Sequence, residues 1–300
     1  MQENIKQPQA VIIGGGPAGV SAALYLARAG IAAAIIENGP GALARAHKID
    51  NYYGISASGS KIYANGLEQA HSQGVQIIND EVIGVEYIDS FTLSLKNTKE
   101  SLTTSTLILA TGTKNVSLNL PGLVQLEGKG ISYCAVCDGF FFRKKKVAVL
   151  GSGAFALHEA EYLRHLASSV TILTNGQDAA AAQAAGFATI TAKLTAVQGE
   201  QRLNSISFAD GTALEVDGLF IAMGTADSTD IARKLGAQIN GRFIRIDSDG
   251  ATNIPGLFAA GDCTGGLLQI AKAVHEGARA GLTALNFIRQ AQAKFSQSKI

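Results

Sequence analysis

Short apolar runs recur along the chain, and two of them are followed at once by a cluster of glycines. The first run, Ala10-Val11-Ile12-Ile13, leads directly into the motif from Gly14 to Gly19. This order predicts a strand that turns tightly into a helix from Val20 to Arg28. A second strand is predicted from Ala32 to Ile36, and Glu37 stands at its end. The segment is therefore predicted to form a strand–helix–strand unit.

The same pattern returns in the middle of the chain. The apolar run Lys146-Val147-Ala148-Val149-Leu150 precedes Gly151-Ser152-Gly153-Ala154-Phe155-Ala156. A helix is predicted from Ala156 to Leu166, and a strand over Val170-Thr171-Ile172-Leu173. Two such units predict an α/β fold with two Rossmann-like dinucleotide-binding domains.

The glycines of the first motif have distinct physical roles. Gly14 permits the tight turn, Gly16 lets the backbone approach a pyrophosphate, and Gly19 brings the helix close to the strand. The helix N-terminus supplies amide donors and positive dipole, and Glu37 can hold a ribose diol. A glycine turn without a ligand is the alternative, but strand, glycines, helix and terminal acid all coincide here.

Three further segments complete the predicted organisation. A strand is predicted from Thr106 to Gly112, ending in Ala-Thr-Gly, and Leu120-Pro121-Gly122 follows as a crossing between domains. Another strand, beginning at Gly256, stops at Asp262. A long amphipathic helix is predicted from Ile270 to Ile288; it could direct its N-terminal dipole at a cofactor, cover the sheet, or do both.

Composition limits the classes of partner. The chain has 300 residues, of which 47% are hydrophobic and 16% charged, and its formal net charge is +1. This charge gives no general attraction to nucleic acid or to an anionic membrane. The polar start before Ala10 leaves no room for a secretory signal, and charges or glycines interrupt every apolar stretch. We therefore expect a cytoplasmic protein that binds no nucleic acid and enters no membrane.

The chain has three cysteines, too few for a secreted disulfide scaffold. Cys134 and Cys137 form a CxxC pair, which can close into a disulfide and reopen with two electrons. A structural zinc site is the alternative, but no second CxxC or paired-histidine motif accompanies the pair. We expect no metal, and we interpret Cys263 as a small buried hydrophobic residue.

These motifs together resemble the low-molecular-weight thioredoxin reductase family of flavoproteins over essentially the whole chain. CxxC followed by Asp-Gly, just before the second glycine motif, is specific to this group. The resemblance implies a three-layer, glutathione-reductase-like fold with FAD as cofactor. It implies a discontinuous FAD-binding domain of residues 1–117 and 244–300. Residues 118–243 would form a degenerate pyridine-nucleotide-type domain that carries the CxxC pair.

The resemblance also implies which residues contact FAD. Asn51 resembles the asparagine that lies near the flavin in this family, although it is also an ordinary loop residue. Asp262 would bind the ribityl chain. The full set of expected cofactor-binding residues is Gly14, Gly16, Pro17, Ala18, Gly19, Glu37, Asn51, Val82, Thr111, Gly112, Gly261, Asp262, Gln269 and Ile270.

For the dithiol, the resemblance implies that Cys137 faces the flavin and that Cys134 attacks the disulfide of a protein substrate. Asp138 would act as acid and base, because thiolate attack and departure need a group that exchanges protons. A helix cap or turn residue is the alternative for Asp138.

The second nucleotide fold departs from NADPH-dependent members of the family. Those enzymes have a His-Arg-Arg run and a further arginine after the corresponding strand, whereas residues 171–192 here contain no lysine, arginine or histidine. A 2′-phosphate without basic partners forfeits about 1.5–3 kcal/mol per charge-assisted hydrogen bond. The strand tip, Thr174 or Asn175, also lacks the acid that would bind the ribose of NADH. NADPH should therefore bind poorly.

This combination resembles the branch of the family in which reduced ferredoxin, rather than NADPH, supplies electrons. Gln269-Ile270-Ala271 replaces the Arg-Gln-Ala that lies beside the flavin in NADPH enzymes. The basic run from Arg143 to Lys146 could attract an acidic ferredoxin or orient a thioredoxin, or could be a solvated loop. The resemblance also implies a homodimer.

We therefore predict a thioredoxin or thioredoxin-like protein reductase with ferredoxin as electron donor. The alternatives that remain open are an NAD(P)H-dependent reductase, a flavin dithiol oxidase and a non-catalytic flavoprotein redox sensor.

Overall fold

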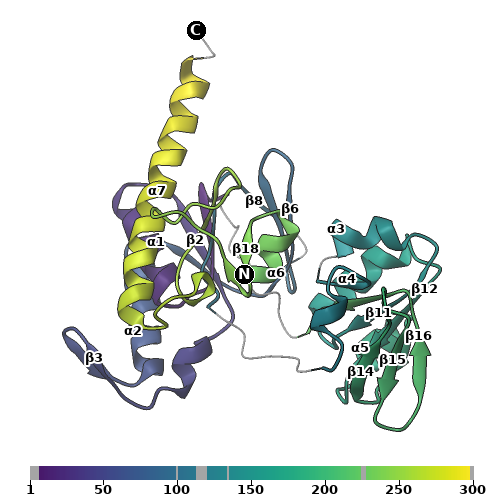
Figure 1. The fold of residues 1–300 in the computed structure, drawn as a ribbon. Coiled ribbons are helices and arrows are strands. Elements are labelled where there is room, and N and C mark those ends of the chain that lie inside the picture. Colours follow the sequence, from purple (N-terminus) through teal and green to yellow (C-terminus); the bar gives the residue numbers. More distant parts are fainter. Residues whose placement is uncertain (1–6, 99–100, 113–119, 134, 224–227, 298–300) are drawn as a thin grey trace. The chain divides into compact units, whose positions relative to one another are not determined.

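The computed structural model describes residues 7–98, 101–112, 120–133, 135–223 and 228–297. The chain divides into two compact units (Figure 1). The first combines Met1–Thr113 with Asp227–Ile300, and the second is Lys114–Ala226. Each unit contains a five-stranded parallel sheet with helices, which confirms the predicted α/β fold with two Rossmann-like domains.

The parallel sheet of the first unit has the strand order β20-β9-β1-β2-β5. Its strands are β1 (Ala10–Ile13), β2 (Ala33–Glu37), β5 (Gln76–Asn79), β9 (Leu107–Leu109) and β20 (Leu257–Ala259). The central strands are apolar at every position before Glu37 because both faces of a parallel sheet are covered. The helices are α1 (Pro17–Arg28), α2 (Gly59–Ser72), α6 (Ser228–Lys234) and α7 (Ile270–Gln297).

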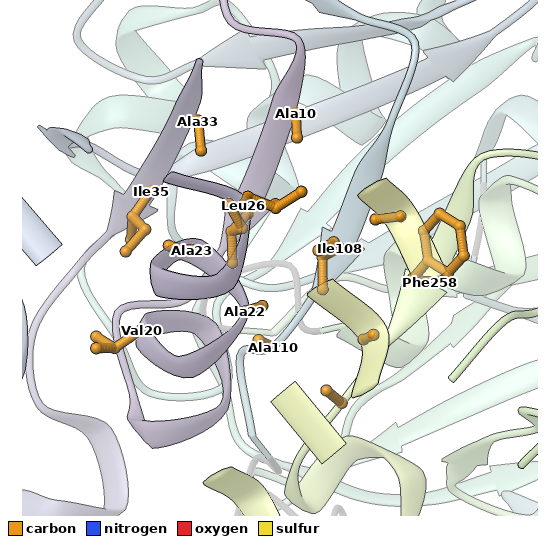
Figure 2. Close-up of a cluster of buried hydrophobic side chains, with 14 of the residues drawn as sticks. Ala10, Val20, Ala22, Ala23, Leu26, Ala33, Ile35, Ile108, Ala110 and Phe258 are labelled. Atoms are coloured by element: carbon orange, nitrogen blue, oxygen red, sulfur yellow. The ribbon is translucent and has the colours of Figure 1, made fainter. Parts of the chain in front are cut away.

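Helix α1 packs on this sheet and on α7. Figure 2 shows Val20, Ala22, Ala23 and Leu26 of α1 beside side chains of the sheet, such as Ile35. Figure 1 shows α7, in yellow, running alongside α1. The crossing is close because α7 has glycines there: a Cβ at Gly277 would lie 2.1 Å from Ala18 O. Small residues on both helices therefore set the distance between them.

Smaller elements complete the first unit. They are an antiparallel sheet of β6 (Val82–Tyr87), β7 (Phe91–Leu95) and β8 (Leu102–Thr104), the hairpin of β3 (Ile49–Tyr52) and β4 (Ile55–Ala57), the pair β18 (Ile239–Asn240) and β19 (Phe243–Ile244), and the 3₁₀ turns η1 (Gly41–Arg45) and η4 (Asp262–Thr264).

The parallel sheet of the second unit has the order β10-β17-β11-β12-β13. Its core packs this sheet against an antiparallel sheet, since Leu150 and Leu219 of the first cluster with Ile206 and Phe208 of the second. The elements are β10 (Ile131–Ser132), β11 (Lys146–Leu150), β12 (Ser169–Leu173), β13 (Ala188–Ile190), β17 (Gly218–Ile221), the antiparallel β14 (Leu194–Gln198), β15 (Ser205–Phe208) and β16 (Ala213–Glu215), the helices α3 (Ala135–Asp138), α4 (Ala154–Arg164) and α5 (Ala180–Ala184), and the 3₁₀ turns η2 (Val124–Leu126) and η3 (Gly139–Phe142).

The second domain boundary differs from the one predicted. We expected the second domain to extend to residue 243, but the chain returns to the first unit at Asp227. Ser228 N donates to Thr111 Oγ1 at 2.8 Å, which joins α6 to the end of β9. Thr229 Oγ1 in turn donates to Arg242 O at 3.1 Å. These bonds place α6 in the first unit. Among the described helices, none is long and apolar enough to span a membrane.

Candidate functional site

A cavity of about 280 Å³ lies in the first unit, where β1, β9 and β20 end. All the expected cofactor-binding residues line it except Gly19, Glu37 and Val82. The members that line it are Gly14, Gly16, Pro17, Ala18, Asn51, Thr111, Gly112, Gly261, Asp262, Gln269 and Ile270. The carboxyl end of a parallel sheet is where such folds bind their ligands.

The glycine motif shapes one wall of this cavity. Gly14 has φ +114°, and a Cβ there would lie 2.3 Å from Ala110 O, so only glycine fits. A Cβ at Gly19 would lie 1.9 Å from Gly14 O, whereas a Cβ at Gly16 would meet nothing within 4 Å. Gly19 is therefore required for packing, while Gly16 leaves open space beside the start of α1. Pro17 at the first helical position suits that start.

Glu37 is buried at the end of β2 and accepts two hydrogen bonds. Gly39 N donates to Glu37 Oε2 at 2.8 Å, and the Tyr63 hydroxyl donates to the same oxygen. Burial, with the hydrogen bond to Glu37, raises the pKa of Tyr63. Glu37 does not line the cavity itself, but Gly39 does. The structure thus holds the carboxylate rigidly beside the cavity.

Asp262 begins the 3₁₀ turn η4, three residues after β20 ends, and lines the cavity. Burial raises its pKa, a positive Lys272 opposes this, and Glu276 adds to it. Lys272 Nζ donates to Gly261 O at 2.8 Å and lies 3.0 Å from Glu276 Oε2. Glu276 Oε2 accepts from Gly261 N at 2.9 Å. This ion pair on α7 therefore clamps the turn that carries Asp262.

Two further pairs tie the walls of the cavity together. Thr111 N donates to Ser228 Oγ at 3.1 Å, which fixes the Ala-Thr-Gly turn after β9. Asn51 Nδ2 donates to Gln269 Oε1 at 3.2 Å. Two residues that the sequence placed near one ligand are thus brought together from opposite ends of the chain. Val82, by contrast, lies in β6 and does not line the cavity; its role stays a prediction.

Of the CxxC pair, Cys137 falls within α3 of the second unit. Cys134 lies outside the described residues, as does the side chain of Cys137. Asp138, the last residue of α3, accepts a hydrogen bond from Ser132 Oγ at 2.7 Å and makes no capping bond. It lines a cavity of about 290 Å³ together with Lys145 and Arg202. This position gives the carboxyl a route to solvent. The other end of α3 is held by Glu159, whose Oε2 accepts from Ala135 N at 2.7 Å.

The second glycine motif repeats the geometry of the first. Gly151 N donates to Leu173 O at 2.9 Å, as Gly14 N donates to Ile36 O at 2.8 Å. The residue that follows Ile36 is Glu37, and the residue that follows Leu173 is Thr174. Thr174 therefore occupies the position at which the first unit has Glu37, the acid expected to bind a ribose.

The polar groups at this second tip bond within the protein. Thr174 Oγ1 donates to Gln177 O at 2.7 Å, and Asn175 Oδ1 accepts from Leu194 N at 2.9 Å. The nearest carbon of Lys193 lies 3.2 Å from a Cβ built at Gly176. The sequence did not single out Lys193, because this residue follows the segment 171–192 that lacks basic side chains. In the structure, the connection between β13 and β14 brings Lys193 back to Gly176, beside the end of β12.

The residues around both sites match a family of known redox proteins. A family model described as pyridine nucleotide-disulphide oxidoreductase matches residues 8–277. The chain belongs to the pyridine nucleotide-disulphide oxidoreductase family. Within this family, a thioredoxin reductase of Ureaplasma parvum serovar 3 is 35% identical over 298 residues, which are 93% of this chain and 96% of the relative.

Solved structures of thioredoxin reductases are also similar to this chain. An atypical thioredoxin reductase from Desulfovibrio vulgaris Hildenborough has a TM-score of 0.88 and 41% identity, covering 95% of this chain and 99% of that one. A ferredoxin-flavin thioredoxin reductase from Clostridium acetobutylicum has a TM-score of 0.69 and 28% identity, covering 95% and 98%. The resemblance to thioredoxin reductases is confirmed, and the chain is an FAD flavoprotein of this type.

The first cavity fits that cofactor. Its glycine wall has the space that a pyrophosphate needs at Gly16, and the acid Asp262 lines it from the turn that follows β20. When bound, FAD supplies the electrons for disulfide reduction.

Sequence reasoning missed Tyr63, Ser132, Glu159 and Lys272. Glu159 carried a readable signal: it falls on the buried face of α4 with Phe155, Ala156, Ala160 and Leu163. A charged residue on such a face needs a partner. Tyr63 and Ser132 carried no comparable signal, because their partners come from other elements. Lys272 and Glu276 have the i,i+4 spacing of a helical ion pair, but the turn that they hold lies outside α7.

Proposed function

We propose that this protein is a cytoplasmic, homodimeric reductase of thioredoxin or a thioredoxin-like protein, and that it draws electrons through FAD from reduced ferredoxin rather than from NADPH. The observation that carries the choice of donor is the second strand tip, where residues 171–192 offer no basic side chain to the 2′-phosphate of NADPH and Thr174 replaces the acid that would bind the ribose of NADH. One unit retains the acid at its strand tip, and the other has a buried threonine whose hydroxyl bonds to Gln177 O. The homodimer rests on the family resemblance alone.

The protein substrate is reduced by thiol–disulfide exchange at α3. The Cys134 thiolate attacks one sulfur of the substrate disulfide, which forms a mixed disulfide and releases the other sulfur as a thiolate. The Cys137 thiolate then displaces the substrate, so a Cys134–Cys137 disulfide forms and a reduced dithiol leaves. Asp138 exchanges the protons that these steps require, and Ser132 holds its carboxylate. Transfer of two electrons through FAD restores the dithiol.

The surface beside α3 suits a protein partner. Phe140 and Phe141 follow Asp138 closely and are 69% and 70% exposed. Large apolar side chains exposed together mark interaction surfaces. Arg143 and Lys144 come next in the chain and are exposed as well. The segment therefore offers an apolar contact with a positive rim, which suits an acidic thioredoxin or ferredoxin.

An anaerobic titration tests the donor. The oxidised holoenzyme is mixed separately with NADPH, NADH and reduced ferredoxin, and the flavin absorbance is followed. We expect rapid bleaching with ferredoxin only, followed by reduction of thioredoxin. Rapid bleaching by micromolar NADPH would refute the donor but leave the dithiol chemistry intact. Oxygen uptake with small dithiols would identify a dithiol oxidase, and lack of turnover with every protein disulfide would identify a redox sensor.

An NAD(P)H-dependent reductase is the second candidate, and Lys193 is the observation that favours it. Its side chain approaches the strand tip where a 2′-phosphate binds in NADPH enzymes. Lys193→Gln separates the candidates. If NADPH bleaches the wild-type flavin and this variant loses the response, Lys193 is the phosphate ligand. If both proteins are inert to NADPH, the ferredoxin proposal stands.

A further inference from the structure

The two oxygens of the acid at the end of β2 have different surroundings. Tyr63, on the second turn of α2, donates its hydroxyl hydrogen to Glu37 Oε2. Gly39 N donates to the same oxygen at 2.8 Å. Glu37 Oε1 accepts no hydrogen bond within the part of the chain that the structure describes. The protein therefore uses one oxygen of this acid and leaves the other to a ligand.

Glu37 lies directly behind the glycine wall of the first cavity. A Cβ built at Gly15, which lines this cavity, would lie 2.9 Å from Glu37 Cβ. Gly39, which donates to Glu37, lines the cavity as well. The whole residue Glu37 is only 5% exposed. A ribose can therefore bond to this acid only if the carboxyl group is held in a suitable orientation.

Tyr63 reaches Glu37 from a second cavity of about 200 Å³, which its side chain lines with residues of α1, α2 and the β3–β4 hairpin. Tyr63 is not among the residues that line the first cavity. The start of α2 is well fixed, because Ser58 caps it and a Cβ at Gly59 would lie 2.1 Å from Leu43 O. The tyrosine thus contacts the acid without occupying the space that fits FAD.

The hydroxyl of Tyr63 also keeps the proton that it donates. Burial raises the pKa of Tyr63, and the hydrogen bond and the charge of Glu37 add to this effect. The phenol therefore remains a hydrogen-bond donor well above neutral pH.

We infer that Tyr63 is a positioning residue for the cofactor: with Gly39 N, its hydroxyl holds Glu37 Oε2 so that Oε1 accepts from the ribose hydroxyls of the adenosine half of FAD. The inference extends the role expected for Glu37 and involves neither the electron donor nor the dithiol. Its consequence is selective. The Tyr63 hydroxyl should strengthen the binding of ligands that carry the ribose diol and should not affect ligands that lack it.

Ligands with and without the ribose hydroxyls test this inference. ADP and 2′,3′-dideoxy-ADP compete with FAD for the full-length apoprotein, and quenching of FAD fluorescence gives the Kd of each competitor at the FAD site. The wild type should bind ADP about tenfold more tightly than the dideoxy compound, because the latter leaves Glu37 Oε1 without a donor. Tyr63→Phe should weaken ADP about fivefold and leave the Kd of the dideoxy compound unchanged.

Tyr52→Phe is the matched control, because Tyr52 lines the same second cavity and this variant should bind both compounds as the wild type does. Three results would overturn the inference for Tyr63→Phe. An unchanged Kd for ADP would show that the hydroxyl is not needed. An equal loss for both compounds would show a general structural role, and tighter binding of ADP would show that the hydroxyl competes with the ribose.

The wild type alone provides a further test that does not depend on the folding of any variant. Equal affinities of the wild type for ADP and the dideoxy compound would show that Glu37 does not hold the ribose, which also overturns the inference. Because no turnover is measured, failure of the ferredoxin or thioredoxin proposals would leave these binding results readable.

Discussion

Asn51 and Gln269 are hydrogen-bonded to each other, with 3.2 Å between Asn51 Nδ2 and Gln269 Oε1. Asn51 comes from β3 of the exposed hairpin, and Gln269 directly precedes α7. The bond therefore ties two cavity walls that no backbone hydrogen bond joins in the described residues. A wall held in place before the cofactor arrives lowers the ordering cost of binding.

Gln269→Ala should therefore weaken FAD binding. Loss of this exposed hydrogen bond costs about 1 kcal/mol, which corresponds to about a fivefold rise in the Kd for FAD. The Kd is measured by titrating FAD with the apoprotein and following the quenching of FAD fluorescence. Gln73→Ala, at an exposed site after α2, is the control and should not change the Kd. An unchanged Kd in Gln269→Ala would show that the bond does not prepare the cavity.

Gly16→Ala and Gly19→Ala should fail in different ways. A Cβ at Gly16 meets no protein atom within 4 Å, so the variant should fold with a nearly unchanged Tm but should lose FAD affinity. A Cβ at Gly19 would lie 1.9 Å from Gly14 O, so this variant should be destabilised by about 3 kcal/mol or more. Thermal unfolding and FAD content of the purified proteins distinguish the two. Equal loss of Tm in both would contradict the assignment of the open space to the cofactor.

Asp80 should make the first unit sensitive to acid. Burial alone would raise its pKa, but hydrogen bonds from Glu81 N, Asn97 and Thr98 Oγ1 lower it below the usual value. A carboxyl whose pKa is lower in the folded state stabilises the fold above the unfolded pKa of about 4, and this contribution is lost as the pH falls through the lower folded value.

Asp80→Asn removes the negative charge that accepts these bonds, so it should lower stability at pH 7 by about 1–3 kcal/mol. The difference from the wild type should shrink below about pH 4, because the carboxyl of the unfolded chain becomes protonated there and the folded carboxyl follows at its lower pKa. Urea unfolding of both proteins at pH 7, 5 and 3 checks this. A difference that grows toward pH 3 would reverse the predicted sign.

Cys263 should be chemically inert in the folded protein. Its side chain is 0% exposed, and burial raises its pKa to about 12. Because the thiolate is the reactive form, iodoacetamide at pH 8 should leave Cys263 unmodified until the protein is unfolded. Mass spectrometry of the Cys263 peptide measures this in the same digest as the dithiol peptide. Rapid labelling in the native state would place Cys263 among the accessible thiols.

The elements near the glycine motifs could be predicted from sequence because several local signals coincide there. The apolar run, the glycines and the acid at Glu37 specify β1, α1 and β2 within a few residues of one another. The strand Lys146–Leu150 was predicted with its observed bounds. Helix α7 was predicted to Ile288 but extends to Gln297. The prediction stopped early because residues 289–294 are exposed and carry no core pattern.

Contacts between distant segments could not be predicted from local pattern. The return to the first unit at Asp227 depends on the bond of Ser228 to Thr111, more than a hundred residues away. Tyr63 meets Glu37, and Lys193 meets the tip near Gly176, only because strand order places them there. The sequence shows that residues 171–192 contain no basic residue. Only the structure shows that the side chain of Lys193 lies close to Gly176.

The roles of the cysteines and of Asp138 can be separated by a single-turnover experiment. The holoenzyme is reduced chemically, the reductant is removed, and reduction of a thioredoxin disulfide is followed, so the natural electron donor has no influence. If Cys134 attacks the substrate, Cys137→Ser should accumulate a mixed disulfide with thioredoxin, because the thiol that resolves it is missing. Cys134→Ser should form none. The opposite pattern would exchange the two roles.

In the same assay Asp138→Asn should slow reduction about 100-fold or more, since general acid–base catalysis contributes that much. Ser132→Ala removes the hydroxyl that donates to Asp138 Oδ2 at 2.7 Å, and it should cost about tenfold by leaving the carboxylate free to rotate. Ser205→Ala, an exposed hydroxyl on β15, is the matched control. If Ser132→Ala matched the wild type while Asp138→Asn remained slow, the carboxyl would act without the hydroxyl, and its position would depend on the fold of α3 alone.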